Sequence, residues 1–369
     1  MTEATNDISN ENDKQYVVLA RKYRPQNFDE LLGQDALVRT LTNAIKNNRL
    51  HHAYILTGIR GVGKTTTARL IAKALNCTGA DGNGGPTVNP CGVCENCKAI
   101  AASRHIDVLE LDAASRTGVD DIREILDGVR YKPTNARYKV YIIDEVHMLS
   151  TSAFNALLKT LEEPPAHVIF ILATTEPHKL LPTILSRCQR YDFRRISAKD
   201  LTGQLIRLSK AEGIDADEAA LSYIADAADG ASRDALSILD QCAAFYMDQR
   251  ITLEKVLDVL GATDRRLFYT MTGILLAHDK TACLKELEEL FASGKDTSRF
   301  LLDWISYLRN ILLLQMMGDE ALSFIVAPES EIAGLRENAG RTGPETISYY
   351  IEELSKLELS LRGAAEKRI

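Results

Sequence analysis

The octapeptide GIRGVGKT at residues 58–65 restricts what this chain can fold into more than any other stretch. It fits the pattern G-x-x-x-x-G-K-[ST], follows the apolar run AYIL and precedes the helix-forming run KTTTARLIAKAL. Glycines let backbone N–H groups surround phosphate oxygens, and the following helix N-terminus adds partial positive charge. A chance glycine-rich turn is the alternative, but the flanking strand and helix favour a nucleotide-binding loop. The predicted nucleotide-binding residues here are Gly58, Ile59, Arg60, Gly61, Val62, Gly63, Lys64, Thr65 and Thr66.

A second apolar run, in VYIIDEVH, ends in two carboxylates, Asp144 and Glu145. We expect Lys64 to reach the β- and γ-phosphates of ATP, and the Thr65 hydroxyl and Asp144 to hold Mg²⁺. Glu145 can polarise the attacking water, so the pattern predicts hydrolysis as well as binding. An acidic turn that merely closes a core strand is the alternative for this pair taken alone.

Short apolar runs alternate with helical stretches up to about residue 195. The runs HAYILTG, IDVLELD, KVYIIDEV and VIFILATT are continuously apolar, which is typical of strands buried on both faces. This alternation predicts a parallel sheet flanked by helices. Further on the pattern is helical, with helix-start signals at Ser197 and Asp215. The sequence therefore predicts an α/β domain followed by two all-α domains.

Length and charge narrow the class of protein. A chain of 369 residues is too long for one hydrophobic core, which favours two or three domains. The net charge of −7 argues against a broad surface that coats nucleic acid, while local DNA contacts stay possible. The apolar runs are too short to cross a bilayer, and the polar segment 1–15 has no signal-peptide pattern. We expect a disordered tail over 1–15 and a cytoplasmic protein; the helical pattern at Ile369 indicates a frayed end or a longer parent chain.

Four cysteines are clustered at short spacings, as Cys77-x13-Cys91-x2-Cys94-x2-Cys97. Four thiolates at such spacings can surround one zinc ion tetrahedrally and leave no open position, so the predicted site is structural. Disulfides are the alternative, and a cytosolic context disfavours them. The remaining cysteines are scattered and are predicted to be buried thiols; they are Cys188, Cys242 and Cys283.

The chain resembles the gamma/tau subunits of bacterial DNA polymerase III clamp loaders, which are AAA+ ATPases. The resemblance rests on the ordered runs LARKYRPQNFDELLGQ, HHAYILTGIRGVGKTTTARLIAKALNC, CGVCENC, DAASRTGVDDIREI, VYIIDEVHMLS, FNALLKTLEEPP, LATTEP and ILSRCQRYDF. It is dense from residue 16 to about 240 and weaker to 369. The resemblance implies an AAA+ domain over 16–196 with a zinc module at about 77–100, a helical lid over 197–261 and a helical collar for oligomerisation over 262–369.

Further site residues are implied by this resemblance. Thr175, at the end of the FILATTEP strand, matches the sensor-1 position. Arg187 of SRC matches an arginine finger that reaches the ATP of a neighbouring subunit, and Arg233 of GASRDALS matches the sensor-2 arginine. Without the family, Arg187 would be read as a solvated surface residue. The segment that surrounds the adenine and ribose is matched by Tyr23, Arg24 and Leu32.

The resemblance also implies function and partners. It points to the ATP-hydrolysing motor of a clamp loader, as a gamma form or a shortened tau, that works with delta and delta-prime subunits, further copies of itself, the beta sliding clamp and primed-template DNA. Helicase and polymerase core are partners only of a longer, tau-type chain. A non-hydrolysing scaffold and a branch-migration helicase are the alternatives. Candidate contacts to the DNA backbone are Arg116, Thr117 and Lys159.

Overall fold

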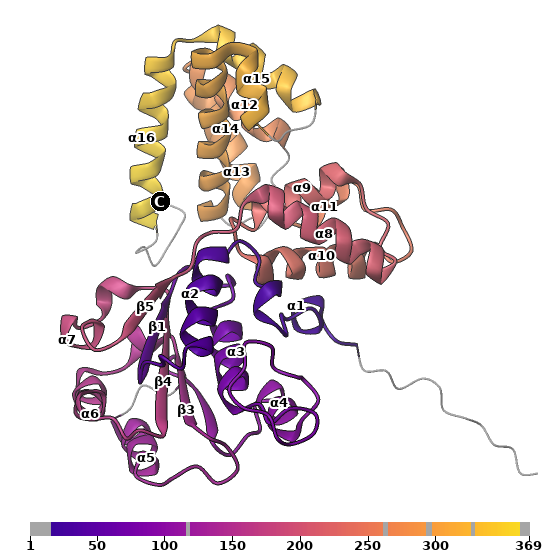
Figure 1. Cartoon of the computed structure of the whole chain (residues 1–369). Coiled ribbons are helices and arrows are strands. Elements are labelled where there is room, and N and C mark those ends of the chain that lie inside the picture. The colour runs from indigo at the N-terminus through magenta and orange to yellow at the C-terminus, as the bar shows by residue number, and fades with distance from the viewer. Residues whose placement is uncertain (1–15, 116–118, 261–264, 293–296, 326–328, 362–369) are drawn as a thin grey trace, which may run out of the picture. The chain divides into compact units, whose positions relative to one another are not determined.

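The computed structural model describes residues 16–115, 119–260, 265–292, 297–325 and 329–361 (Figure 1). The predicted tail at 1–15 and the end of the chain at 362–369 lie outside the described residues. None of the described helices combines the length and the apolar character that crossing a membrane requires.

Two compact units make up the chain, and each is described by itself. The first comprises the described residues up to Ile214 together with Ile224–Gln241. The second comprises Asp215–Tyr223 together with the described residues from Cys242 onward. The domain boundaries predicted at 196/197 and 261/262 stay predictions.

A five-stranded parallel sheet forms the centre of the first unit, in the order β2-β3-β4-β1-β5. Its strands are β1 (Ala53–Thr57), β2 (Val108–Asp112), β3 (Lys139–Asp144), β4 (Val168–Thr174) and β5 (Gln189–Asp192). The four predicted strands are confirmed. The fifth, β5, escaped prediction because only Tyr191 of its four residues is buried, as is common for a strand at the edge of a sheet.

Helices cover both faces of this sheet (Figure 1). On one face the side chains of Ile55, Tyr141 and Phe170 join a buried cluster with residues of α5 (Val119–Val129) and α6 (Thr151–Glu162). The helix α3 (Lys64–Asn76) packs against β3 and β4 and is drawn on the opposite side of the sheet from α5 and α6. The first unit also contains α1 (Leu19–Lys22), η1 (Phe28–Glu30), α2 (Asp35–Lys46), α4 (Glu95–Ala101), η2 (Val146–Met148), η3 (Pro177–Lys179) and α7 (Pro182–Leu185).

The register of the parallel strands brings polar residues to one edge of the sheet. Thr57 of β1 pairs with Thr174 of β4, and Asp112 of β2 pairs with Asp144 of β3. All of these residues end their strands, so the carboxyl ends of four neighbouring strands meet at this edge. In open parallel sheets ligands bind outside the carboxyl ends of the strands.

The helical stretch that follows β5 begins where the sequence predicts it. Ser197 caps α8 (Ala198–Glu212), because its hydroxyl oxygen accepts a hydrogen bond from the Asp200 N–H at 3.1 Å. The helix start predicted at Asp215 is wrong: α9 (Glu218–Ala227) begins three residues later, since Asp215 and Ala216 instead pair with Ile251. The next helices are α10 (Ser232–Phe245) and α11 (Leu253–Val259).

The C-terminal part of the second unit is helical, as predicted. Its elements are α12 (Arg265–Leu276), α13 (Lys280–Ala292), α14 (Thr297–Met317), η4 (Gly318–Phe324), α15 (Glu329–Arg341) and α16 (Pro344–Leu361). α14 packs against α12, α15 and α16, and its residues Phe300, Trp304 and Leu308 are buried. The Trp304 indole N–H donates to the Thr272 hydroxyl at 3.0 Å, so this buried polar group is satisfied.

A buried carboxylate orders the loop that leads into β3. Asp107 is 1% exposed and accepts backbone N–H bonds from Thr134, Asn135 and Ala136 at 2.7–3.0 Å. Hydrogen bonds to a charged acceptor stabilise a fold more than neutral ones do. Asp107 therefore determines where the chain enters β3.

Replacing Asp107 by alanine should lower the free energy of unfolding by about 3 kcal/mol, because three backbone N–H donors lose their buried, charged acceptor. Urea unfolding followed by circular dichroism would measure the loss. Asp107→Asn is the matched control: it keeps one acceptor oxygen and should lose clearly less. Equal stability of Asp107→Ala and the unsubstituted chain would contradict this role.

Candidate functional site

The loop between β1 and α3 depends on glycine at two positions. Gly58 has a φ of 147°, and a Cβ added there would lie 2.8 Å from the Cβ of Phe193. Gly61 has a φ of 78°, and a Cβ there would lie 3.1 Å from the Cβ of Ala231. Glycine is therefore needed both for the backbone conformation and for the close approach of the neighbouring chain.

This loop opens into a cavity of about 610 Å³. Every predicted nucleotide-binding residue except Gly58 and Ile59 lines it, including Tyr23, Arg24 and Leu32. Asp144, Glu145 and Arg233 also line it, whereas Thr175 and Arg187 do not. The cavity wall also contains residues that the sequence analysis missed, among them Asp112, Gln204 and Ser232. Asp112 could have been found from its place at the end of a predicted strand.

Lys64 is a buried cation at the start of α3. It is 5% exposed, and its ammonium donates to the carbonyl oxygens of Gly58 and Ile59 at 2.9 Å each. Burial lowers the pKa of Lys64, while the nearby carboxylates of Glu145 and Asp144 act in the opposite direction. The ammonium thus lies at the bottom of the loop, beside two negative charges.

Thr65 and Asp144 offer oxygen ligands to a divalent cation. The Thr65 hydroxyl donates to Asp144 Oδ2 at 2.5 Å, and the Glu145 N–H donates to Asp144 Oδ1 at 2.9 Å. A hydroxyl and a carboxylate are groups that Mg²⁺ prefers, and both lie at the wall of the cavity. These residues fit a magnesium ion bound together with nucleotide phosphates.

Glu145 is held by the neighbouring strand. Its Oε2 accepts the Thr175 hydroxyl at 3.0 Å and the Thr175 N–H at 3.3 Å. Its φ is 45°, a left-handed conformation that is uncommon for a residue with a side chain and is often found at functional sites. Thr175 therefore contacts the Glu145 carboxylate directly and does not line the cavity.

The two predicted arginines lie in different surroundings. Arg187 follows α7, and its guanidinium donates to Glu162 Oε1 at 2.6 Å and to the Thr183 carbonyl at 2.8 Å. It therefore lies away from the cavity of its own chain. Arg233 lies in the first turn of α10, and its backbone N–H donates to the Gly61 carbonyl at 3.2 Å. This bond attaches α10 to the loop between β1 and α3.

The predicted DNA contacts and the predicted adenine contact of Tyr23 have less structural support than the residues above. Lys159 is exposed on α6, while Arg116 and Thr117 lie outside the described residues. The Tyr23 hydroxyl donates to Glu212 of α8, a hydrogen bond that raises the pKa of Tyr23. No structural feature assigns a DNA contact to Lys159.

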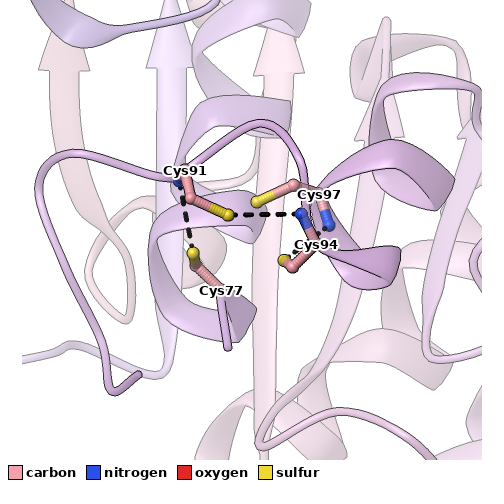
Figure 2. A group of neighbouring side chains, drawn as sticks. All are labelled: Cys77, Cys91, Cys94 and Cys97. Atoms are coloured by element: carbon pink, nitrogen blue, oxygen red, sulfur yellow. Dashed lines mark hydrogen bonds between the residues drawn. The ribbon is translucent and has the colours of Figure 1, made fainter. Parts of the chain in front are cut away.

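Cys77, Cys91, Cys94 and Cys97 gather at one point, and their sulfurs all lie within 4.8 Å of one another (Figure 2). Cys77 follows the last residue of α3, and Cys94 caps α4 by accepting the Cys97 N–H at 3.4 Å. The Cys91 N–H donates to the Cys77 sulfur, and the Cys94 N–H donates to the Cys91 sulfur, each at 3.3 Å. Tetrahedral zinc with Zn–S bonds of about 2.3 Å needs sulfurs roughly 3.8 Å apart, which this group can provide.

The local environment favours a thiolate at Cys94. Burial raises the pKa of the Cys94 thiol, but hydrogen bonds from Cys97 and Thr78 lower this pKa to about 6. Burial raises the pKa of the Cys97 thiol, which a positive metal ion would reverse. The four cysteines are thus compatible with a metal ion. The other predicted thiols differ in exposure: Cys242 is buried, and Cys188 and Cys283 are partly buried.

The sheet, the glycine loop and the two acidic residues define a P-loop protein of the AAA+ class. Three family models match it: DNA polymerase III, delta subunit, at residues 33–197; DNA polymerase III clamp loader subunit, ATPase lid domain, at 200–246; and DNA polymerase III subunits gamma and tau domain III, at 251–369. The chain belongs to the family of DNA polymerase III gamma and tau subunits, as the relatives described next show.

Three relatives illustrate this membership. The chain is 43% identical to DNA polymerase III subunit gamma/tau of Mycobacterium tuberculosis strain H37Rv, over 96% of this chain and 61% of that protein. It is 48% identical to DNA polymerase III subunit tau of Bacillus subtilis, over 81% of this chain and 52% of that protein. It is 42% identical to subunit gamma of Buchnera aphidicola, over 88% of each. The chain thus spans between half and two thirds of the first two relatives.

The Thermotoga maritima RuvB Holliday junction branch migration motor superposes with a TM-score of 0.47 and 21% identity, over 69% of this chain and 80% of that one. A likeness of this size carries no argument about function.

Gly58→Ala should lower the free energy of unfolding by about 2 kcal/mol, because alanine is strained at this φ and its Cβ meets Phe193. Urea unfolding would measure the change. The matched control is Gly203→Ala on the exposed surface of α8, where nothing lies near the added Cβ and stability should rise by up to about 1 kcal/mol. If both variants were equally stable, the loop would not need glycine at position 58.

Proposed function

We propose that this chain is the ATP-hydrolysing motor subunit of a bacterial clamp loader. In this role it couples ATP binding and hydrolysis to the opening of a sliding clamp and its loading on primed DNA. One observation carries the proposal: Lys64, Thr65, Asp144 and Glu145 converge on a single cavity. A scaffold that only binds nucleotide has no need for Glu145 beside the magnesium ligands. The family membership supplies the clamp-loading context.

Each residue at the cavity has a chemical role in this proposal. The N–H groups of the loop and the Lys64 ammonium bind the phosphates, and Thr65 and Asp144 hold Mg²⁺. Glu145 orients the attacking water once its carboxylate turns from Thr175 toward the γ-phosphate. Arg233 contacts the γ-phosphate from α10, which its backbone bond to Gly61 already holds at the loop. Tyr23, Arg24 and Leu32 surround the adenine and ribose.

Arg187 acts on the ATP of a neighbouring subunit. Its position outside the cavity of its own chain supports this assignment, and its guanidinium, paired with Glu162, is partly exposed. An arginine supplied by a neighbour makes hydrolysis depend on assembly. The assembly contains delta and delta-prime subunits, further copies of this chain, the beta clamp and primed DNA, in the bacterial cytoplasm. Residues 262–369 act as its collar.

Zinc is the metal that we assign to the four cysteines. Four sulfur ligands at these distances suit zinc, and a site without an open position has a structural role. When bound, the ion would join the end of α3 to the start of α4 and so stabilise the module at about 77–100.

The proposed function is tested by the ATP hydrolysis rate of the chain assembled with delta and delta-prime subunits, with and without clamp and primed DNA. Clamp and DNA should stimulate turnover, and Glu145→Gln should reduce kcat by at least about a hundredfold while ATP still binds. A low, unstimulated rate with ATP bound would favour the scaffold instead, and unwinding of DNA without a clamp would favour a helicase.

Arg187→Ala should abolish stimulated turnover in the same assembly, a loss of about a thousandfold, and leave ATP affinity unchanged. Arg190→Ala, which removes a nearby arginine that is exposed, is the matched control and should keep normal turnover. Normal turnover of Arg187→Ala would disprove the role of this residue in a neighbouring site.

Elemental analysis of protein purified without chelators should find about one zinc per chain. Cys97→Ser should lose the metal, and the matched control Cys283→Ser should retain it. Absence of zinc together with four reactive thiols in the unsubstituted chain would contradict the assignment.

A further inference from the structure

A histidine outside every predicted role lies between the ends of β3 and β4. His147 belongs to η2, which follows Glu145 directly and packs against β4. Its side chain is only 7% exposed. The imidazole Nδ1 lies 3.0 Å from the Thr174 hydroxyl, and Nε2 lies 3.0 Å from Glu176 Oε2. One imidazole thus contacts both residues that flank Thr175.

These contacts belong to a closed set of hydrogen bonds. The Thr174 hydroxyl also accepts the Glu176 N–H at 3.0 Å, so His147, Thr174 and Glu176 form a ring. If Nε2–H donates to Glu176, then Nδ1 accepts the Thr174 O–H, and both ring nitrogens have a partner. Thr175 lies between Thr174 and Glu176 in the chain, and it donates both its N–H and its hydroxyl to Glu145.

The same imidazole is close to Glu145. His147 Nδ1 lies 3.5 Å from Glu145 Oε2, the oxygen that Thr175 holds. The other titratable groups near the imidazole are Glu176, which pairs with Lys179 at 2.7 Å, and His178, whose Nε2 lies 3.9 Å from Glu176 Oε1. His147 therefore faces the carboxylate, and it also fixes the strand end that holds it.

We propose that His147 is a positioning residue for Glu145. It holds the chain at Thr174–Glu176, and with it Thr175, and so limits the positions that the Glu145 carboxylate can take when it turns to the attacking water. The inference rests on the proposed ATP hydrolysis, in which Glu145 orients the water. A misplacement of about 1 Å of such a group can reduce turnover a hundredfold.

The kinetic test compares His147→Phe, which fills the same space without ring nitrogens, with His147→Gln, whose amide can still donate to Glu176. In the full assembly with clamp and primed DNA, His147→Phe should lower kcat at least tenfold and change ATP affinity less than twofold, and His147→Gln should recover part of kcat. The matched control is His178→Phe, whose ring is exposed and should be dispensable. Unchanged kcat in His147→Phe, or equal losses of kcat and ATP affinity in both variants, would overturn the proposal.

A second measurement does not depend on hydrolysis. In the nucleotide-free full chain, hydrogen exchange at the Thr175 and Glu176 N–H groups should become at least tenfold faster in His147→Phe, with exchange in α14 unchanged. If the unsubstituted assembly fails to hydrolyse ATP, the proposed function fails and this exchange result alone decides the role of His147. Unchanged exchange at Thr175 and Glu176 would show that His147 does not hold the strand end.

Discussion

Parallel pairing of β3 with β4, and of β4 with β1, brings Asp144, Thr174 and Thr57 to the same edge of the sheet. Alternate residues of a strand point to opposite faces of the sheet. A slip of one residue would therefore move buried side chains such as Tyr141 and Phe170 from the face covered by α5 and α6 to the opposite face. The buried faces therefore set the register, and the register in turn sets the spacing of the polar groups. The site depends on packing that takes no part in its chemistry.

Hydrogen bonds orient the carboxylates of the two acidic residues at this edge. Asp144 is engaged by the Thr65 hydroxyl, and Glu145 is engaged by Thr175. Lys64 satisfies its buried charge with two loop carbonyl oxygens. Each of these groups has a partner that a phosphate, a magnesium ion or a water could replace, so binding would exchange one set of polar contacts for another without leaving a buried charge unpaired.

The helix α3 connects the nucleotide-binding loop to the cysteine cluster, since Lys64 begins it and Cys77 follows its last residue. The end of α3 is also tied to the chain before β3. Arg137 donates to the carbonyl oxygens of Leu75 and Cys77, at 3.1 Å and 2.8 Å, and the Asn76 side chain accepts the Arg137 N–H. A metal ion at the cysteines would thus stabilise the part of the fold that supports β3 as well as the small module around it.

The sequence by itself determined the class of fold, the glycine loop after β1, the acidic pair and the four cysteines, because each is encoded by residues close together in the chain or by a repeated apolar pattern. It missed β5, whose QRYD run carries no apolar pattern, and it misplaced the start of α9, where Ala216 pairs with Ile251 far along the chain. Only the tertiary structure decided that Thr175 contacts Glu145, that Arg187 lies outside its own cavity and that His147 joins two strand ends. These are contacts between residues on different strands and helices. The sequence gives the side chains that are present, but which of them come into contact depends on how the parallel strands are placed side by side.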